Sequence, residues 1–140
     1  MKRYLLDTGI LSAYLRGRPR ITALVDSWIV SDEAATSILV YGEIIEYLRS
    51  ASDFEQRREG LREVLIDVAA LPLDYTIMEH YADFRRVMRP PFGSGLIGDV
   101  DTLIAATAKV HGLTVITADS DYMRVPNLQV QLIERNWLKA

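Results

Sequence analysis

The apolar residues of this chain alternate between two kinds of spacing. Short apolar runs, typical of buried strands, are followed by longer stretches in which apolar residues recur every three or four positions, as in amphipathic helices. The predicted strands cover residues 3–7, 34–37, 71–73, 113–117 and 128–133. The predicted helices cover residues 8–17, 19–29, 38–48, 53–68, 75–88 and 99–111. This alternation indicates an α/β fold with a central, mainly parallel sheet flanked by helices, and we expect residues 1–140 to form a single domain.

One predicted helix, residues 38–48, has apolar residues nearly all round, so we expect it to be buried. Glu43 lies in the middle of it, and no basic residue stands three or four positions away to pair with its carboxylate. A carboxylate among apolar side chains is unfavourable unless something offsets its charge. Glu43 is therefore a candidate functional residue, although Tyr47 offers a hydrogen-bond donor that would give it a structural role.

Further acids stand where predicted strands and helices meet. Asp7 ends the first strand and Asp119 follows the fourth, so both should lie at the carboxyl edge of the sheet, where parallel sheets bind their ligands. Asp99 and Asp101 open the last predicted helix. Several carboxylates gathered in one place favour a divalent cation with oxygen ligands.

Each of these acids also has an ordinary structural interpretation. Asp7 is a suitable cap for the helix that follows it, and acids at a helix start, such as Asp99, complement the helix dipole. Asp119 and Asp121 fit ordinary turn chemistry after a strand. We favour Asp101 as a metal ligand, with Asp99 as a helix cap or as a group behind the ligands.

The composition excludes several classes of site. The chain has no cysteine, so it cannot carry a disulfide framework, a thiolate zinc site or a cysteine nucleophile. No stretch approaches the roughly 20 apolar residues of a membrane span. Asp7 interrupts the N-terminal apolar run too early for a secretory signal. We therefore expect a cytoplasmic protein with no membrane contact.

The formal net charge of −3 argues against binding of nucleic acid through a broad electrostatic field. A local cluster of Arg16, Arg18 and Arg20 stands at a predicted helix end, where it either solvates that end or contacts phosphate. Arg16 is our candidate for a substrate contact. Thr8 and Thr117, beside the strand-end acids, are candidates for hydrogen bonds to a ligand or to a carboxylate.

Four segments of the chain, in their order and spacing, resemble the PIN-domain family and, more particularly, the VapC-type toxins of prokaryotic toxin–antitoxin pairs. These segments are Leu5-Leu6-Asp7-Thr8, the helix around Glu43, Gly98-x-x-Asp101-x-Leu103-Ile104-Ala105-Ala106 and Val115-Ile116-Thr117-x-Asp119. The resemblance implies the PIN fold and a Mg²⁺- or Mn²⁺-dependent endoribonuclease. It implies a set of four catalytic, metal-holding acids: Asp7, Glu43, Asp101 and Asp119. Asp99 is an additional candidate for the metal, whose role the pattern does not settle.

The chain departs from the commonest family pattern at two positions. Gly9 stands where Asn is frequent, and Tyr122 stands where Phe is frequent. Neither change removes an acid, so the resemblance still implies activity.

The resemblance also implies partners. VapC-type toxins are inhibited by a cognate VapB-type antitoxin, usually form homodimers and cleave RNA, and transfer, ribosomal and messenger RNA are all open as substrates here. Four apolar residues of the first two predicted helices either form a groove for an antitoxin segment or belong to the core: Leu11, Tyr14, Leu15 and Trp28.

Two other functions stay open. The first is a catalytically silent module of the same fold that only binds protein or RNA. The second, which we favour less, is a metal-dependent phosphatase with a strand-end Asp nucleophile, which also needs a nearby Lys and usually a second Asp two residues on. Here the residue two after Asp7 is Gly9, and the only lysines are Lys2, Lys109 and Lys139.

Overall fold

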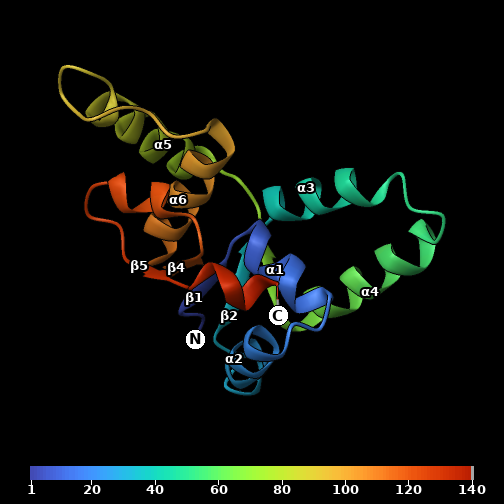
Figure 1. Ribbon diagram of the computed structural model, residues 1–140. Coiled ribbons are helices and arrows are strands. Elements are labelled where there is room, and N and C mark those ends of the chain that lie inside the picture. The colour runs from blue at the N-terminus through green and yellow to red at the C-terminus, as the bar shows by residue number, and fades with distance from the viewer. Residues whose placement is uncertain (140) are drawn as a thin grey trace.

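A five-stranded sheet, parallel throughout, forms the centre of the computed structural model, which describes residues 1–139 (Figure 1). Its strands are β1 Tyr4–Leu6, β2 Ala34–Ser37, β3 Ala69–Leu71, β4 Thr114–Thr117 and β5 Val130–Leu132. They lie in the order β3-β2-β1-β4-β5, with every neighbouring pair parallel. The predicted α/β fold with a parallel sheet is therefore confirmed.

The strand order reverses at the middle of the sheet. From β1, the sheet grows through β2 and β3 on one side and through β4 and β5 on the other. In parallel sheets, ligands bind at this kind of reversal, outside the carboxyl ends of the two strands concerned. The ends of β1 and β4 thus mark the expected position of a site, and Asp7 comes one residue after β1 and Asp119 two residues after β4.

Six α-helices and two short 3₁₀ turns surround the sheet within residues 1–139. They are α1 Thr8–Leu15, α2 Pro19–Val30, α3 Ile38–Leu48, α4 Phe54–Asp67, α5 Tyr75–Met88, α6 Asp99–His111, η1 Ser120–Arg124 and η2 Arg135–Leu138. Local chemistry sets several of their ends. The Ser37 side chain caps α3 by accepting a hydrogen bond from the Leu39 N–H. Gly112, at φ 66°, ends α6 in a left-handed conformation that glycine adopts without strain.

The core of the described chain lies between the sheet and its helices. Leu5 and Leu6 of β1 are fully buried, as are Val115 and Ile116 of β4. The inward side of α6 is built mainly from small residues that are also fully buried, which lets this helix pack closely. No helix in residues 1–139 combines the length and apolarity that crossing a bilayer requires.

Two details of the fold differ from the predictions. The third strand lies at residues 69–71 instead of 71–73, because Pro72 has no N–H for the ladder. Helix α3 is not buried all round: Val40 faces the core, whereas the side chains of Ile38 and Tyr47 are 43% and 76% exposed. It packs one side on the molecule, and α3 and α4 extend together away from the sheet (Figure 1).

Candidate active site

Four acids from separate parts of the chain line one cleft of about 410 Å³. Asp7 follows β1, Glu43 lies on α3, Asp101 lies in the first turn of α6, and Asp119 comes two residues after β4. The rest of the wall comprises Thr8, Gly9, Ala118, Arg135, Leu138 and Lys139. We refer to this space as the acid cleft. The structure thus brings together the four acids that the sequence singled out.

Asp7 is the most buried of these acids, with 8% of its surface exposed. One carboxylate oxygen accepts a hydrogen bond from the Ile10 N–H at 3.0 Å and so caps α1, while the other accepts from the Thr117 hydroxyl. Burial raises the pKa of Asp7 to about 6, although both hydrogen bonds oppose the shift. The nearby charges of Asp101 and Asp119 contribute to this rise. Asp7 therefore caps α1, as predicted, and the charges of other acids in the cleft raise its pKa.

Asp101 is held by a tyrosine. The Tyr122 hydroxyl donates a hydrogen bond to Asp101 Oδ1 at 3.0 Å, and the Tyr122 side chain is 1% exposed. Burial raises the pKa of Asp101, the Tyr122 hydrogen bond lowers it, and the charges of Asp119 and Glu43 raise it again. Sequence reasoning treated Tyr122 only as a departure from the family pattern. The one sequence feature that could have indicated this role is the hydroxyl of Tyr122, at a position where Phe is frequent in the family.

Thr117 connects two of the acids. Its hydroxyl donates to Asp7 and accepts from the Asp119 N–H at 2.9 Å, so one side chain orients both strand ends. Asp119 Oδ1 in turn accepts from the Asp121 N–H at 2.9 Å, which starts η1. The Asp121 carboxylate lies 3.5 Å from the Arg124 guanidinium and does not line the acid cleft. Of these two acids, Asp119 belongs to the cleft and Asp121 to the turn beside it.

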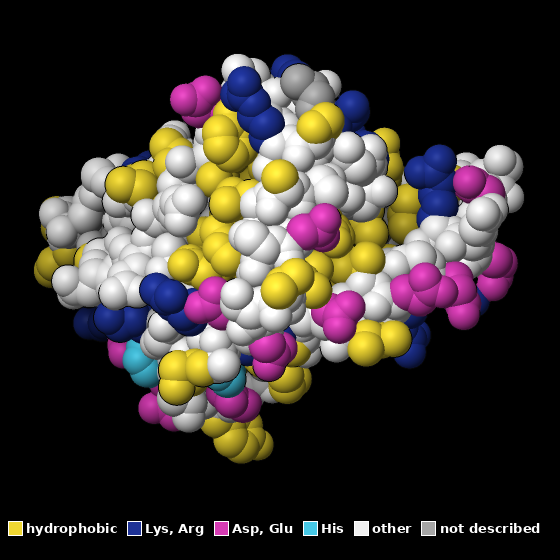
Figure 2. All heavy atoms as spheres, turned by 90° about the horizontal axis from the view of Figure 1, so that it is seen from below, with side chains coloured by type: hydrophobic (Ala, Val, Ile, Leu, Met, Phe, Trp, Pro, Cys, Tyr) yellow, Lys and Arg dark blue, Asp and Glu magenta, His cyan; other side chains and the backbone are white. Residues whose placement is uncertain are grey.

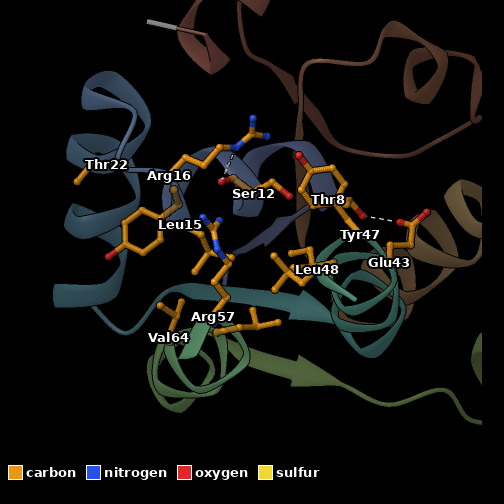
Figure 3. A pocket seen from close by; sticks show the side chains of 15 residues that line it. Thr8, Ser12, Leu15, Arg16, Thr22, Glu43, Tyr47, Leu48, Arg57 and Val64 are labelled. Atoms are coloured by element: carbon orange, nitrogen blue, oxygen red, sulfur yellow. Dashed lines mark hydrogen bonds between the residues drawn. The ribbon is translucent and has the colours of Figure 1, made fainter. Parts of the chain in front are cut away.

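Glu43 is half-buried and joins α3 to α1 by accepting a hydrogen bond from the Thr8 hydroxyl. These two residues also border a second, larger cleft of about 620 Å³ between α1 and the α3–α4 pair. Figure 3 shows their hydrogen bond at one end of this second cleft and Thr22 at the other. Arg16 lines the second cleft, with its Nε atom 3.4 Å from the Ser12 carbonyl, and not the acid cleft.

Asp99 does not line the acid cleft, although it begins the same helix as Asp101. Its carboxylate is paired with the Arg85 guanidinium and lies 3.3 Å from the Tyr81 hydroxyl. Its side chain is 69% exposed. The structure therefore gives Asp99 a partner on α5 instead of a place among the acids.

The four apolar residues of the first two helices divide between the two alternatives, core and groove. Leu11 is fully buried and Trp28 is 8% exposed and stacked on Tyr4, so both belong to the core. Tyr14 and Leu15 do line the second cleft. The period of a helix does not by itself separate a core-facing residue from one at the edge of a cleft.

The donor chemistry of the acid cleft fits a hard cation. All four acids offer oxygen, and the raised pKa values of Asp7 and Asp101 mean that added positive charge would favour their ionised forms. Within residues 1–139, no three carboxylate or imidazole groups converge closely enough to enclose an ion by themselves. Mg²⁺ does not need such a cage, because it usually keeps several waters and takes only one or two carboxylates from the protein. The residues present therefore fit a partly hydrated Mg²⁺ ion.

A family model described as "PIN domain" matches residues 4–128. The chain belongs to the PIN-domain family. This PIN domain is 33% identical over 124 residues to Toxin FitB of Neisseria gonorrhoeae, covering 83% of this chain and 87% of that protein. It is 26% identical over 138 residues to Ribonuclease VapC1 of Haemophilus influenzae, covering 97% and 98% of the two chains.

The fold is shared with solved structures as well. The structure of VapBC-1 from nontypeable Haemophilus influenzae aligns with a TM-score of 0.79 at 25% identity, over 92% of this chain and 96% of that one. The resemblance found in the sequence is therefore confirmed, both for the PIN fold and for its likeness to VapC-type toxins.

Proposed function

We propose that this PIN domain is a metal-dependent endoribonuclease, the toxin of a VapBC-type toxin–antitoxin pair. The observation that carries the proposal is the acid cleft, which Asp7, Glu43, Asp101 and Asp119 line at the carboxyl edge of the sheet. The names of the relatives support it, since one is called a toxin and another a ribonuclease. We further propose that it acts in the cytoplasm, on RNA.

The roles of the acids follow from their positions. Asp7 and Asp101 would hold Mg²⁺ or Mn²⁺, with Glu43 and Asp119 as ligands either directly or through water. Such an ion, when bound, offsets the repulsion among the carboxylates and lowers the pKa of a water at an RNA phosphorus.

Side chains around the acids keep them in place. Thr117 orients the Asp7 side chain and the backbone N–H of Asp119, and Thr8 orients Glu43. Tyr122 uses one oxygen of Asp101 and leaves the other free for a ligand. Fixed donors of this kind reduce the reorganisation that the site needs during the reaction.

We propose that the second cleft receives a segment of a VapB-type antitoxin. Apolar side chains line much of it, including those of Leu15, Leu48 and Val64. Because the cleft reaches Glu43, a segment seated in it would end beside the acids. A homodimer is part of the same proposal, in line with the family.

The test is cleavage of purified total RNA by the isolated protein with Mg²⁺, with EDTA and with an Asp101→Asn variant. We expect discrete fragments that require the metal and that fall by at least about 100-fold in the variant, because the change removes charge but little volume. Circular dichroism would check that the variant is folded. Full cleavage by folded Asp101→Asn protein would contradict the assignment, and no cleavage by the wild type with either metal would favour a silent binding module.

A further inference from the structure

The last described turn of the chain, η2, forms one wall of the acid cleft. Arg135 begins this turn, Leu138 ends it and Lys139 follows, and all three line the cleft together with the acids. Sequence reasoning did not predict this turn or assign it a role. Figure 1 shows the red C-terminal segment lying beside α1 and β1.

Apolar and aromatic contacts hold the turn in place. It packs on α1 and α2, and the Arg20 guanidinium lies 5.4 Å from the centre of the Trp137 ring. The Leu138 side chain lies 3.8 Å from the point where a Cβ atom on Gly9 would stand, and the same point is 3.7 Å from Asp7 Oδ1. The turn is therefore anchored beside Asp7 and Gly9, which line the acid cleft. Its position relative to the acids is set by packing, not by the charges of its cations.

Arg135 and Lys139 have no acidic partner among residues 1–139. Among residues 1–139, neither Arg135 nor Lys139 forms an ion pair or a side-chain hydrogen bond. Six other basic residues are paired with acids: Lys2, Arg3, Arg57, Arg58, Arg85 and Arg124. Arg135 and Lys139 differ from the remaining described cations because they line the acid cleft. Cations left unpaired beside a group of carboxylates are available to a ligand that is itself an anion.

A polynucleotide faces an electrostatic obstacle at this cleft. Four carboxylates repel each phosphate of an approaching strand, and a divalent ion compensates only part of that charge. The net charge of −3 provides no general attraction. The face in Figure 2 shows Lys and Arg side chains scattered among Asp and Glu instead of gathered in one basic patch. Attraction of the strand therefore depends on local cations at the mouth of the cleft.

We propose that Arg135 and Lys139 bind phosphates of the RNA strand that flank the bond being cleaved. The guanidinium of Arg135 suits two phosphate oxygens at once, and the ammonium of Lys139 acts as a mobile point charge on the next phosphate. The inference rests on the proposed ribonuclease function and names the residues that hold its substrate.

The experiment measures binding of a fluorescein-labelled single-stranded RNA of mixed sequence by anisotropy, in an Asp101→Asn background that does not cleave it. Arg135→Gln and Lys139→Gln are compared with Arg86→Gln, a matched control on the exposed face of α5. We expect each of the first two changes to weaken binding and to reduce the slope of log affinity against log salt by about 0.7, the value for one contact to single-stranded phosphate. The control should leave affinity and slope unchanged.

A second measurement separates phosphate binding from damage to the site. Isothermal titration of Mg²⁺ into proteins with Asp101 intact should show that Arg135→Gln binds the ion at least as tightly as wild type, since a nearby positive charge has been removed. Equal RNA binding and salt slopes in all variants would overturn the proposal while leaving the ribonuclease function standing. Weakened Mg²⁺ binding would overturn it too, by showing that the residue shapes the site. Absence of RNA binding and of RNA cleavage by the parent protein would instead refute the proposed function.

Discussion

At the scale of single residues, the surroundings of Asp7 affect its pKa in two opposite directions. Its hydrogen bonds from Ile10 and Thr117 favour the ionised carboxylate, whereas burial and the neighbouring acids favour the protonated one. Burial prevails, since the pKa rises to about 6. In the absence of a cation, the folded protein therefore keeps an unfavourable charge at neutral pH, which a bound metal would compensate.

The first prediction concerns the stability of metal-free protein. The pKa of Asp7 is about 6 in the folded protein, above its ordinary value of 3.8. Between pH 4 and pH 6 the folded state therefore binds a proton that the unfolded state has lost, so the free energy of unfolding falls as pH rises from about 4 to about 6. The whole shift corresponds to up to about 3 kcal/mol. In EDTA at pH 7, Asp7→Asn should therefore be more stable than wild type by about 1–3 kcal/mol, although inactive.

Urea denaturation of both proteins at pH 4.5 and pH 7 would check this. The advantage of Asp7→Asn should shrink at the lower pH, where wild-type Asp7 is protonated. An equal difference at both pH values would contradict the assigned cause.

The second prediction concerns the hydrogen bond from Tyr122 to Asp101. Tyr122→Phe keeps the buried ring but removes the donor, so Asp101 is less well oriented and its ionised form is less favoured. We expect the Mg²⁺ concentration for half-maximal cleavage to rise by about tenfold, with a loss of about 1.5 kcal/mol in stability. Mg²⁺ titration by calorimetry measures the effect without relying on activity. Tyr75→Phe, at a ring that is 90% exposed, is the control, and equal affinities in the two variants would rule out a positioning role.

At the scale of elements, helix α6 separates two acids that are only two residues apart in sequence. Asp101 faces the acid cleft and Tyr122, whereas Asp99 turns to Arg85 on α5. The α5 and α6 helices lie side by side (Figure 1), so the Asp99–Arg85 pair serves their packing. A turn of about 100° per residue is enough to send neighbours of this spacing to different sides of a helix.

The third prediction follows from this division of roles. Asp99→Asn should retain activity within about twofold of wild type and lose about 1 kcal/mol of stability or less, because the ion pair is largely solvated. Asp101→Asn, a change of the same kind two residues on, should lose nearly all activity. Measuring RNA cleavage and thermal unfolding of the two variants would test this prediction. A severe loss of cleavage in Asp99→Asn would place Asp99 in the site.

At the scale of the whole molecule, two clefts meet at one hydrogen bond. The acid cleft and the second cleft share Thr8 and Glu43, so whatever occupies the second cleft lies next to the acids. The carboxylates are drawn together from elements spread over most of the chain. Their mutual repulsion therefore acts against the fold as a whole, and a cation that relieves it should stabilise the entire domain.

The fourth prediction is a metal-dependent melting temperature. At pH 7, Mg²⁺ at about 100 times its dissociation constant should add about 2.7 kcal/mol to the free energy of unfolding, reversibly with EDTA. An Asp7→Asn/Asp101→Asn double variant should show almost none of this gain. Differential scanning fluorimetry with Mg²⁺ and with K⁺ at equal ionic strength would measure it. The same gain in the double variant would mean that the ion binds elsewhere.

The sequence by itself determined the class of fold and the identity of the four acids. Alternating strand and helix patterns predicted most elements to within a few residues, because both depend on local spacing of apolar side chains. Asp7 and Asp119 could be assigned to one edge because parallel strands place their carboxyl ends together. Glu43 stood out as an acid among apolar residues of a helix, Asp101 as an acid in the first turn of another, and the family resemblance, now confirmed, joined all four acids into one set. That all of these acids act on a metal stays a prediction.

Tertiary structure alone decided which side chains surround the acids. Tyr122 reaches Asp101 from 21 residues away, and Thr117 reaches Asp7 from 110 residues away. Arg135 and Lys139 join the cleft only because Trp137 and Leu138 pack the last turn against α1 and α2. Local periodicity contains no information about such contacts, since they depend on the relative placement of elements that are distant in the chain. The charges were visible in the sequence, but only the packing decided which of them face one another.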